Sequence, residues 1–165
     1  MKIELKNFKF YDKLSEETLC FTANIWVNGT KCGSAENRGY GGCASYHHEG
    51  TASSRELIAE AESYCKSNDT TLWDYLDHLA CELVAVKQKD TLAKKLNKEM
   101  QKAILIGIDD GSKIEYQVIS FKLPLREMWE NYPDHFKLTL NNKLEKYASK
   151  GYKLLNTNIP QQFLN

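Results

Sequence analysis

The 165-residue sequence lacks the features of several special classes of protein. No apolar run approaches the roughly 18 residues that a membrane-spanning helix needs, and the N-terminus has no apolar core of a signal peptide. Acidic and basic residues number 22 each, giving a formal net charge of zero. A strongly basic nucleic-acid-binding protein is therefore not indicated. We expect a cytoplasmic protein that has neither a membrane nor a nucleic acid as its partner.

Paired cysteines are also missing. The five cysteines are Cys20, Cys32, Cys43, Cys65 and Cys81, an odd number with no Cys-x-x-Cys pair. Without a secretory signal, this pattern predicts free thiols in a reducing cytosol, so a disulfide framework is not expected.

The first third of the sequence has the pattern of β-strands. Apolar residues alternate along residues 21–27, and Asn28-Gly29 then supplies the two positive-φ positions of a type I′ hairpin turn. Apolar parity changes near Lys6-Asn7, which predicts a β-bulge there. We expect a three-stranded antiparallel meander that ends near Glu36.

The rest of the sequence alternates between helical and strand patterns. Ser53-Ser-Arg-Glu56 resembles a capping box at the start of one helix, and an apolar stripe from Leu72 predicts a second, long or interrupted helix. A later hairpin around residues 109–111, helices after Pro124 and at Pro133, and a strand near residues 152–155 follow. The sequence predicts one α+β domain over residues 1–165, an antiparallel sheet covered by helices.

The segment from Asn37 to His48 is the main candidate for a functional site. It combines glycines, a thiol, a guanidinium group and two imidazoles directly after the predicted meander, and loops on such a rigid base often carry function. The polar turn before the second strand can face the same end of the sheet. The predicted ligand-binding residues are Glu16, Glu17, Asn37, Arg38, Gly39, Tyr40, Gly41, Gly42, Cys43, Tyr46, His47 and His48.

Two interpretations use the glycines of this segment. They can simply turn the chain from sheet to helix, since glycine adopts positive φ without strain. Alternatively, their backbone amides can form an anion-binding nest, with Arg38 as a clamp and Tyr40 or Tyr46 as a stacking surface for a base. The spacing matches neither a Walker A loop nor a dinucleotide-binding fingerprint.

Two further interpretations use the thiol and the imidazoles. Cys43, His47 and His48 could ligate a metal with help from Cys32, but the second ligand segment typical of zinc sites is missing, and we expect no cofactor. Cys43 could instead act as a nucleophile with His47 or His48 as its base, although no third group that would orient the imidazole is evident. Whether catalysis occurs is left open.

Three segments together carry a family resemblance. Ser15-Glu-Glu-Thr18, Phe21-Thr-Ala-Asn-Ile-Trp-Val-Asn-Gly29 and Asn37-x-Gly-x-Gly-Gly42 followed by His47 resemble a pattern in small uncharacterised proteins of bacteriophages and bacterial mobile elements. The resemblance implies an accessory protein of the host cytosol that binds a small polar ligand, such as a nucleotide signal, or a host protein, and that antagonises host defence. The alternatives are a hydrolase or nucleotide-processing enzyme and a structural protein-interaction module.

Overall fold

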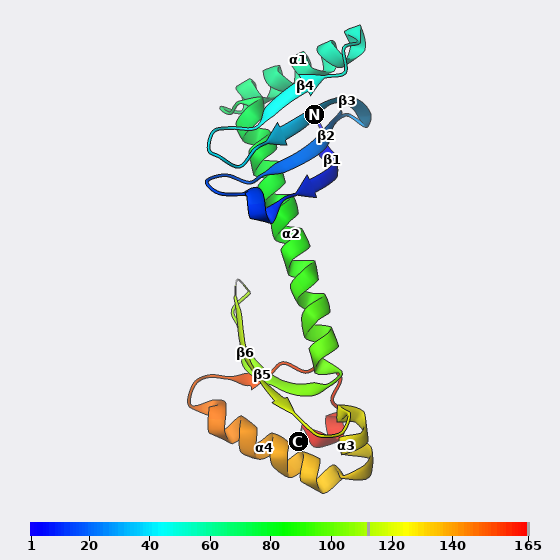
Figure 1. Cartoon of the computed structure of the whole chain (residues 1–165), viewed down its shortest axis with the longest axis vertical. Coiled ribbons are helices and arrows are strands. Elements are labelled where there is room, and N and C mark those ends of the chain that lie inside the picture. The colour runs from blue at the N-terminus through cyan, green and yellow to red at the C-terminus, as the bar shows by residue number, and fades with distance from the viewer. Residues whose placement is uncertain (112, 165) are drawn as a thin grey trace. The chain divides into compact units, whose positions relative to one another are not determined.

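The computed structural model describes residues 1–111 and 113–164 and divides the chain into two compact units, Met1–Lys89 and Asp90–Asn165 (Figure 1). Each unit has a hydrophobic core of its own, whereas we expected one domain over residues 1–165. The division falls within the long helix α2 (Leu72–Met100), where every side chain from residue 85 to residue 95 is exposed. The larger apolar side chains of this stretch, Val86 and Leu92, are exposed, and neither belongs to one of the hydrophobic cores.

The first unit contains a four-stranded antiparallel meander with the order β1-β2-β3-β4. The three predicted strands are present, and a fourth strand is added by the second half of the candidate segment. The turn at Asn28-Gly29 has the two expected positive φ values, 49° and 84°. The predicted bulge is also present, because Asn7 has a φ of 53° and the register of β1 shifts between Lys6 and Lys9. The strands are β1 (Ile3–Phe10), β2 (Phe21–Val27), β3 (Thr30–Asn37) and β4 (Ser45–His48).

One face of this sheet is covered by α1 (Ala52–Ser67) and the first part of α2, as Figure 1 shows. Alternate residues of β2, from Phe21 to Val27, are buried against these helices, and the intervening residues lie half-buried on the opposite face. Helix α1 begins two residues earlier than its capping-box pattern predicted. The Thr51 hydroxyl caps it by accepting a hydrogen bond of 3.1 Å from the Ser54 amide. Polar side chains therefore lie mainly on the face of the sheet that α1 and α2 do not cover.

The second unit contains a three-stranded antiparallel sheet with the order β6-β5-β7. Ile104 and Ile106 of β5 pack on Phe136 and Leu140 of helix α4, which begins at Pro133 as predicted. Leu105 faces the other way and packs against Met100 at the end of α2. The elements of this unit that follow α2 are β5 (Ala103–Asp109), β6 (Ile114–Ser120), α3 (Leu125–Asn131), α4 (Pro133–Ala148), β7 (Lys153–Leu154) and a 3₁₀ turn, Gln161–Phe163.

The predicted α+β class, with antiparallel strands covered by helices, is confirmed, although the strands are divided between two sheets. The hairpin near residue 110 and the strand within residues 152–155 are both observed. No helix in the part of the chain that the structure describes is long and apolar enough to cross a membrane.

The buried side chain of Asn156 holds the start of β5 and the end of α2 together through hydrogen bonds. Its Oδ1 accepts a hydrogen bond of 2.6 Å from the Leu105 amide, and its Nδ2 donates to the carbonyl oxygens of Met100 and Ala103 at 3.2 and 3.0 Å. The Leu105 amide and the Ala103 carbonyl would otherwise be buried without partners, whereas the Met100 carbonyl also accepts a hydrogen bond of 2.8 Å from Asn158 Nδ2. Asn156 thus connects α2, β5 and the C-terminal segment.

Replacement of Asn156 by Ala should destabilise the second unit. The change leaves buried backbone groups unpaired, so we expect the free energy of unfolding to fall by about 3 kcal/mol. Urea denaturation, followed by hydrogen exchange of the β5 amides, measures this loss. Asn142→Ala, at an exposed position of α4, is the matched control and should change little. Equal stability of the two variants would contradict the role given to Asn156.

Candidate functional site

The candidate segment begins at the end of β3, crosses to α2 and returns as β4. Its first residue, Asn37, is 5% exposed, and its side chain makes four hydrogen bonds. Oδ1 accepts from the Thr18 hydroxyl and the Gly39 amide, both at 2.9 Å, whereas Nδ2 donates to the Gly42 carbonyl and to Asp77 Oδ1, both at 3.2 Å. A buried amide that is satisfied in this way has no capacity left for a ligand. Asn37 is therefore a structural residue.

Two further polar groups hold the glycine loop in place. Asp77 of α2 accepts a second hydrogen bond, of 2.8 Å, from the Ala44 amide, and the Thr18 hydroxyl accepts from the Gly41 amide at 3.4 Å. The loop is thus connected to the segment before β2 on one side and to α2 on the other. These contacts explain why Thr18 and Asp77, which lie outside the predicted segment, determine its conformation.

Gly39 is required by its surroundings as well as by its backbone. Its φ is 86°, and a Cβ at this position would overlap the Leu14 carbonyl oxygen. Its own carbonyl oxygen accepts hydrogen bonds from the amides of Glu16, Glu17 and Thr18, at 2.9 to 3.3 Å. The structural interpretation of the glycines therefore accounts for Gly39.

Glu16 and Glu17 lie beside the loop, as predicted. The Glu17 Oε2 lies 2.6 Å from the point that a Cβ on Gly41 would occupy. Both glutamates line a depression of about 460 Å³ that reaches Asp77 and Cys81 on α2. The carboxylates of Glu16 and Glu17 give its edge a negative charge, which would repel an anionic ligand such as a phosphate.

The remaining groups do not form the predicted phosphate site. The Gly39 and Gly41 amides are occupied by Asn37 and Thr18, as described above. The side chain of Arg38 is 82% exposed, and its Nη2 lies 3.4 Å from Glu36 Oε1. Tyr40 is 63% exposed at the tip of the loop. Arg38 and Tyr40 therefore point outward without a shared cavity.

Cys43 is an exposed thiol whose partner is a carboxylate. Its Sγ lies 3.6 Å from Asp74 Oδ1. This hydrogen bond, with smaller effects of burial and of the Asp74 and Asp77 charges, raises the pKa of the Cys43 thiol above its ordinary value. A higher pKa disfavours the thiolate that nucleophilic catalysis or metal ligation needs. Neither role is supported by this environment.

Tyr46 packs between the sheet of the first unit and its helices. Its hydroxyl donates a hydrogen bond of 2.6 Å to Glu62 on α1, and its ring lies 6.2 Å from the ring of Trp73 on α2. Burial, followed by the Glu62 hydrogen bond, raises the pKa of Tyr46 to about 12. The tyrosine is on the helix-covered face of the sheet and cannot stack on a ligand from the other face.

The two imidazoles have different surroundings. His48 accepts a hydrogen bond of 2.9 Å from the Gly50 amide through its Nδ1, and this contact orders the turn into α1. His47 lies opposite Ser34 on the open face of the sheet. Cys32 is buried, and its Sγ is 3.6 Å from the Ile25 carbonyl. Among the described residues, no three potential metal ligands lie close enough to hold an ion.

His47 instead lines a hollow on the uncovered face of the four-stranded sheet, which we call the sheet hollow. Its volume is about 330 Å³, and all four strands contribute to it. The lining residues are Asn7, Lys9, Thr22, Ala23, Asn24, Ser34, Ala35, Glu36 and His47. Of these, only His47 is among the predicted site residues. The signal for the others was available in the polar alternation of β2 and in the bulge at Asn7.

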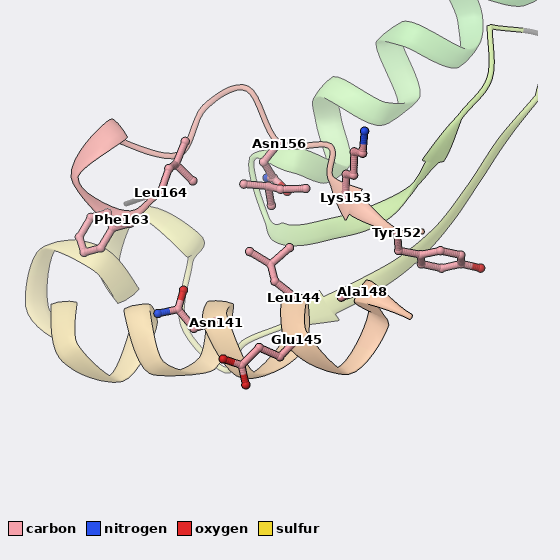
Figure 2. Close-up of a pocket in the computed structure, with 10 residues that line it drawn as sticks. Asn141, Leu144, Glu145, Ala148, Tyr152, Lys153, Asn156, Phe163 and Leu164 are labelled. Atoms are coloured by element: carbon pink, nitrogen blue, oxygen red, sulfur yellow. The ribbon is translucent and has the colours of Figure 1, made fainter. Parts of the chain in front are cut away.

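The second unit has a larger depression of about 630 Å³ between α4 and the C-terminal segment (Figure 2). Leu144 projects from α4 toward the strand side, and Phe163 lies at one end (Figure 2). Leu154 and Leu164 also contribute, so most of this surface is apolar. None of the predicted site residues lines it.

No family model, curated protein or solved structure matches this chain. The assignment of a function therefore depends on the chemistry of the surfaces described above.

Replacement of Gly39 by Ala should destabilise the first unit by about 2 kcal/mol or more, because a methyl group adds a steric overlap to an unfavourable φ. Gly42→Ala is the matched control, since Gly42 has nearly the same φ, 85°, and nothing within 4 Å of its Cβ position. Urea denaturation, with hydrogen exchange of β2 and β3, compares the two. Equal losses would show that φ strain alone acts at Gly39.

Replacement of Asp74 by Asn should make Cys43 more reactive. The amide keeps the shape of the carboxylate but removes the charge-assisted hydrogen bond and the negative charge that raise the pKa of the Cys43 thiol, so the thiolate fraction at a given pH increases. Alkylation by iodoacetamide at pH 8, measured by peptide mass spectrometry, should be several-fold faster at Cys43. Cys81, the other exposed thiol, is the internal control. An unchanged rate at Cys43 would contradict the effect given to Asp74.

Proposed function

We propose that the protein is a non-enzymatic binding protein that takes a small anionic, polar ligand in the sheet hollow. The observation that supports this proposal is the hollow itself, in which polar side chains from four strands surround about 330 Å³. This volume lies at the lower end of the range of small-molecule sites. The strands that form it also pack against the core of the first unit, so its floor is rigid.

The charges around the hollow favour an anion. Lys9 has no acidic partner within the described residues, whereas Glu36 is paired with Arg38. The free positive charge at the rim is therefore that of Lys9, and a phosphate or carboxylate group could accept a charge-assisted hydrogen bond from it.

The floor of the hollow offers hydrogen bonds instead of further charge. Thr22 and Lys9 lie opposite each other on neighbouring strands, as do Asn24 and Ser34. Hydroxyl and amide groups both donate and accept hydrogen bonds, and they can therefore recognise the polar parts of a ligand beyond its anionic group. His47, opposite Ser34, forms the wall on the β4 side. A nucleotide fits this chemistry, with its phosphate at Lys9.

Binding is preferred to catalysis because the groups that an enzyme would need lie apart. The Cys43 thiol bonds to a carboxylate on α2, His48 supports a turn, and His47 lies on the open face. In the bacteriophage context that the sequence resemblance implies, the protein would act in the host cytosol by sequestering a small signal molecule of host defence.

Calorimetry with inorganic phosphate and a panel of linear and cyclic nucleotides tests the proposal. Binding of at least one of these probes is expected, and Lys9→Gln should weaken it by about tenfold through the loss of a charge-assisted hydrogen bond. Lys13→Gln removes an exposed lysine that lies outside the hollow and should leave the affinity unchanged. Absence of heat for every probe, or equal affinities of the two variants, would contradict the proposal.

A further inference from the structure

The four strands at sheet edges differ in how well they are protected against pairing with another chain. In the first unit, β1 carries a bulge and three lysines within or beside it, Lys2, Lys6 and Lys9, and β4 is four residues long. In the second unit, β7 has two residues. Bulges, lysines and short length are the usual defences of an edge strand. Among the described residues, β6 is the edge strand that has seven residues, no bulge and no lysine within it, although Lys113 directly precedes it.

Strand β6 presents a continuous, regular edge. It pairs with β5 without a register shift over all seven of its residues, from Ile114 to Ser120, and Glu115 is its one charged residue. Val118 is 49% exposed although it is apolar. These are properties of a strand that pairs on both sides.

The hydrogen bonds of β5 show which backbone groups of β6 point outward. The amide and carbonyl of Leu105 bond to Asn156 and Leu155, and the Ala103 carbonyl also bonds to Asn156, all on the side away from β6. In an antiparallel ladder, the residues opposite these, Val118 and Ser120, therefore direct their own N–H and C=O groups outward. By the same alternation, Ile114 and Tyr116 do so as well.

We propose that β6 pairs antiparallel with β6 of a second copy of this chain, about a two-fold axis at Gln117. In this register Tyr116 lies opposite Val118 of the second copy, and Ile114 lies opposite Ser120. Each residue whose backbone N–H and C=O point outward then lies opposite such a residue of the second copy. These four pairs would form about eight backbone hydrogen bonds between the copies. This inference concerns the second unit and does not depend on a ligand in the sheet hollow.

The side chains of β6 are compatible with this self-pairing. A two-fold axis at Gln117 places Glu115 of one copy opposite Ile119 of the other, so the two Glu115 carboxylates do not lie opposite each other. Val118 gains the ring of Tyr116 from the second copy as a cross-strand neighbour, and aromatic pairs with β-branched residues stabilise sheets. Both copies contribute the same surface, as an isologous dimer interface requires.

Analytical ultracentrifugation of the full chain over a concentration series tests the pairing. We expect a dimer with twice the mass of the 19.0-kDa chain. Val118→Pro removes an outward N–H without a loss of bonds to β5, and it should weaken the dimer by about 10- to 30-fold. Hydrogen exchange of β5 checks that the unit remains folded. A monomer at millimolar concentration would overturn the proposal, as would an unaffected Val118→Pro dimer.

A charge exchange at Gln117 tests the register independently. Gln117→Lys and Gln117→Glu each place like charges opposite one another at the two-fold axis, so each variant should dimerise more weakly by several-fold. Mixing the two variants should restore dimers that contain one of each. Gln161→Lys, an exposed change away from β6, is the control and should dimerise normally. Failure of the mixture to form mixed dimers would overturn this register.

Discussion

The arrangement of the loops in the first unit depends on the hydrogen bonds of one buried side chain, that of Asn37. One buried amide joins the segment before β2, the glycine loop and α2, because it contacts Thr18, Gly42 and Asp77 together. A buried amide without these partners would be costly, and each partner is itself held by backbone contacts nearby. The network therefore fixes the loop as a unit.

This constraint changes which surface is available for function. The amides of Gly39 and Gly41 and the side chain of Asn37 are bonded within the loop and its neighbours, so folding explains this part of its conspicuous sequence. Within the part of the chain that the structure describes, the side chains of Lys9, Asn24 and His47 make no hydrogen bond or ion pair, and they lie on the other face of the sheet. The proposed ligand site is therefore on the face that no helix of the first unit covers.

Local patterns were sufficient to predict most of the elements. The bulge at Asn7, the turn at Asn28-Gly29 and the helix that begins at Pro133 depend on neighbouring residues, and all three were predicted. The contact between Asn37 and Asp77 spans 40 residues, so no local pattern could reveal it. We expected one domain, although the apolar stripe of α2 is interrupted at Lys87-Gln-Lys-Asp90, where the division between the two compact units falls. The sheet hollow could have been found in part, because Thr22 and Asn24 already marked a polar face.

The central claim is that the open face of the sheet, and not the glycine loop, binds the ligand. Amide chemical shifts measured by NMR during titration with the nucleotide that binds most tightly test this claim directly. We expect the largest changes at Lys9, Asn24, Ser34 and His47. Chemical-shift changes concentrated at residues 38–43 would contradict this claim and would place the ligand site in the glycine loop.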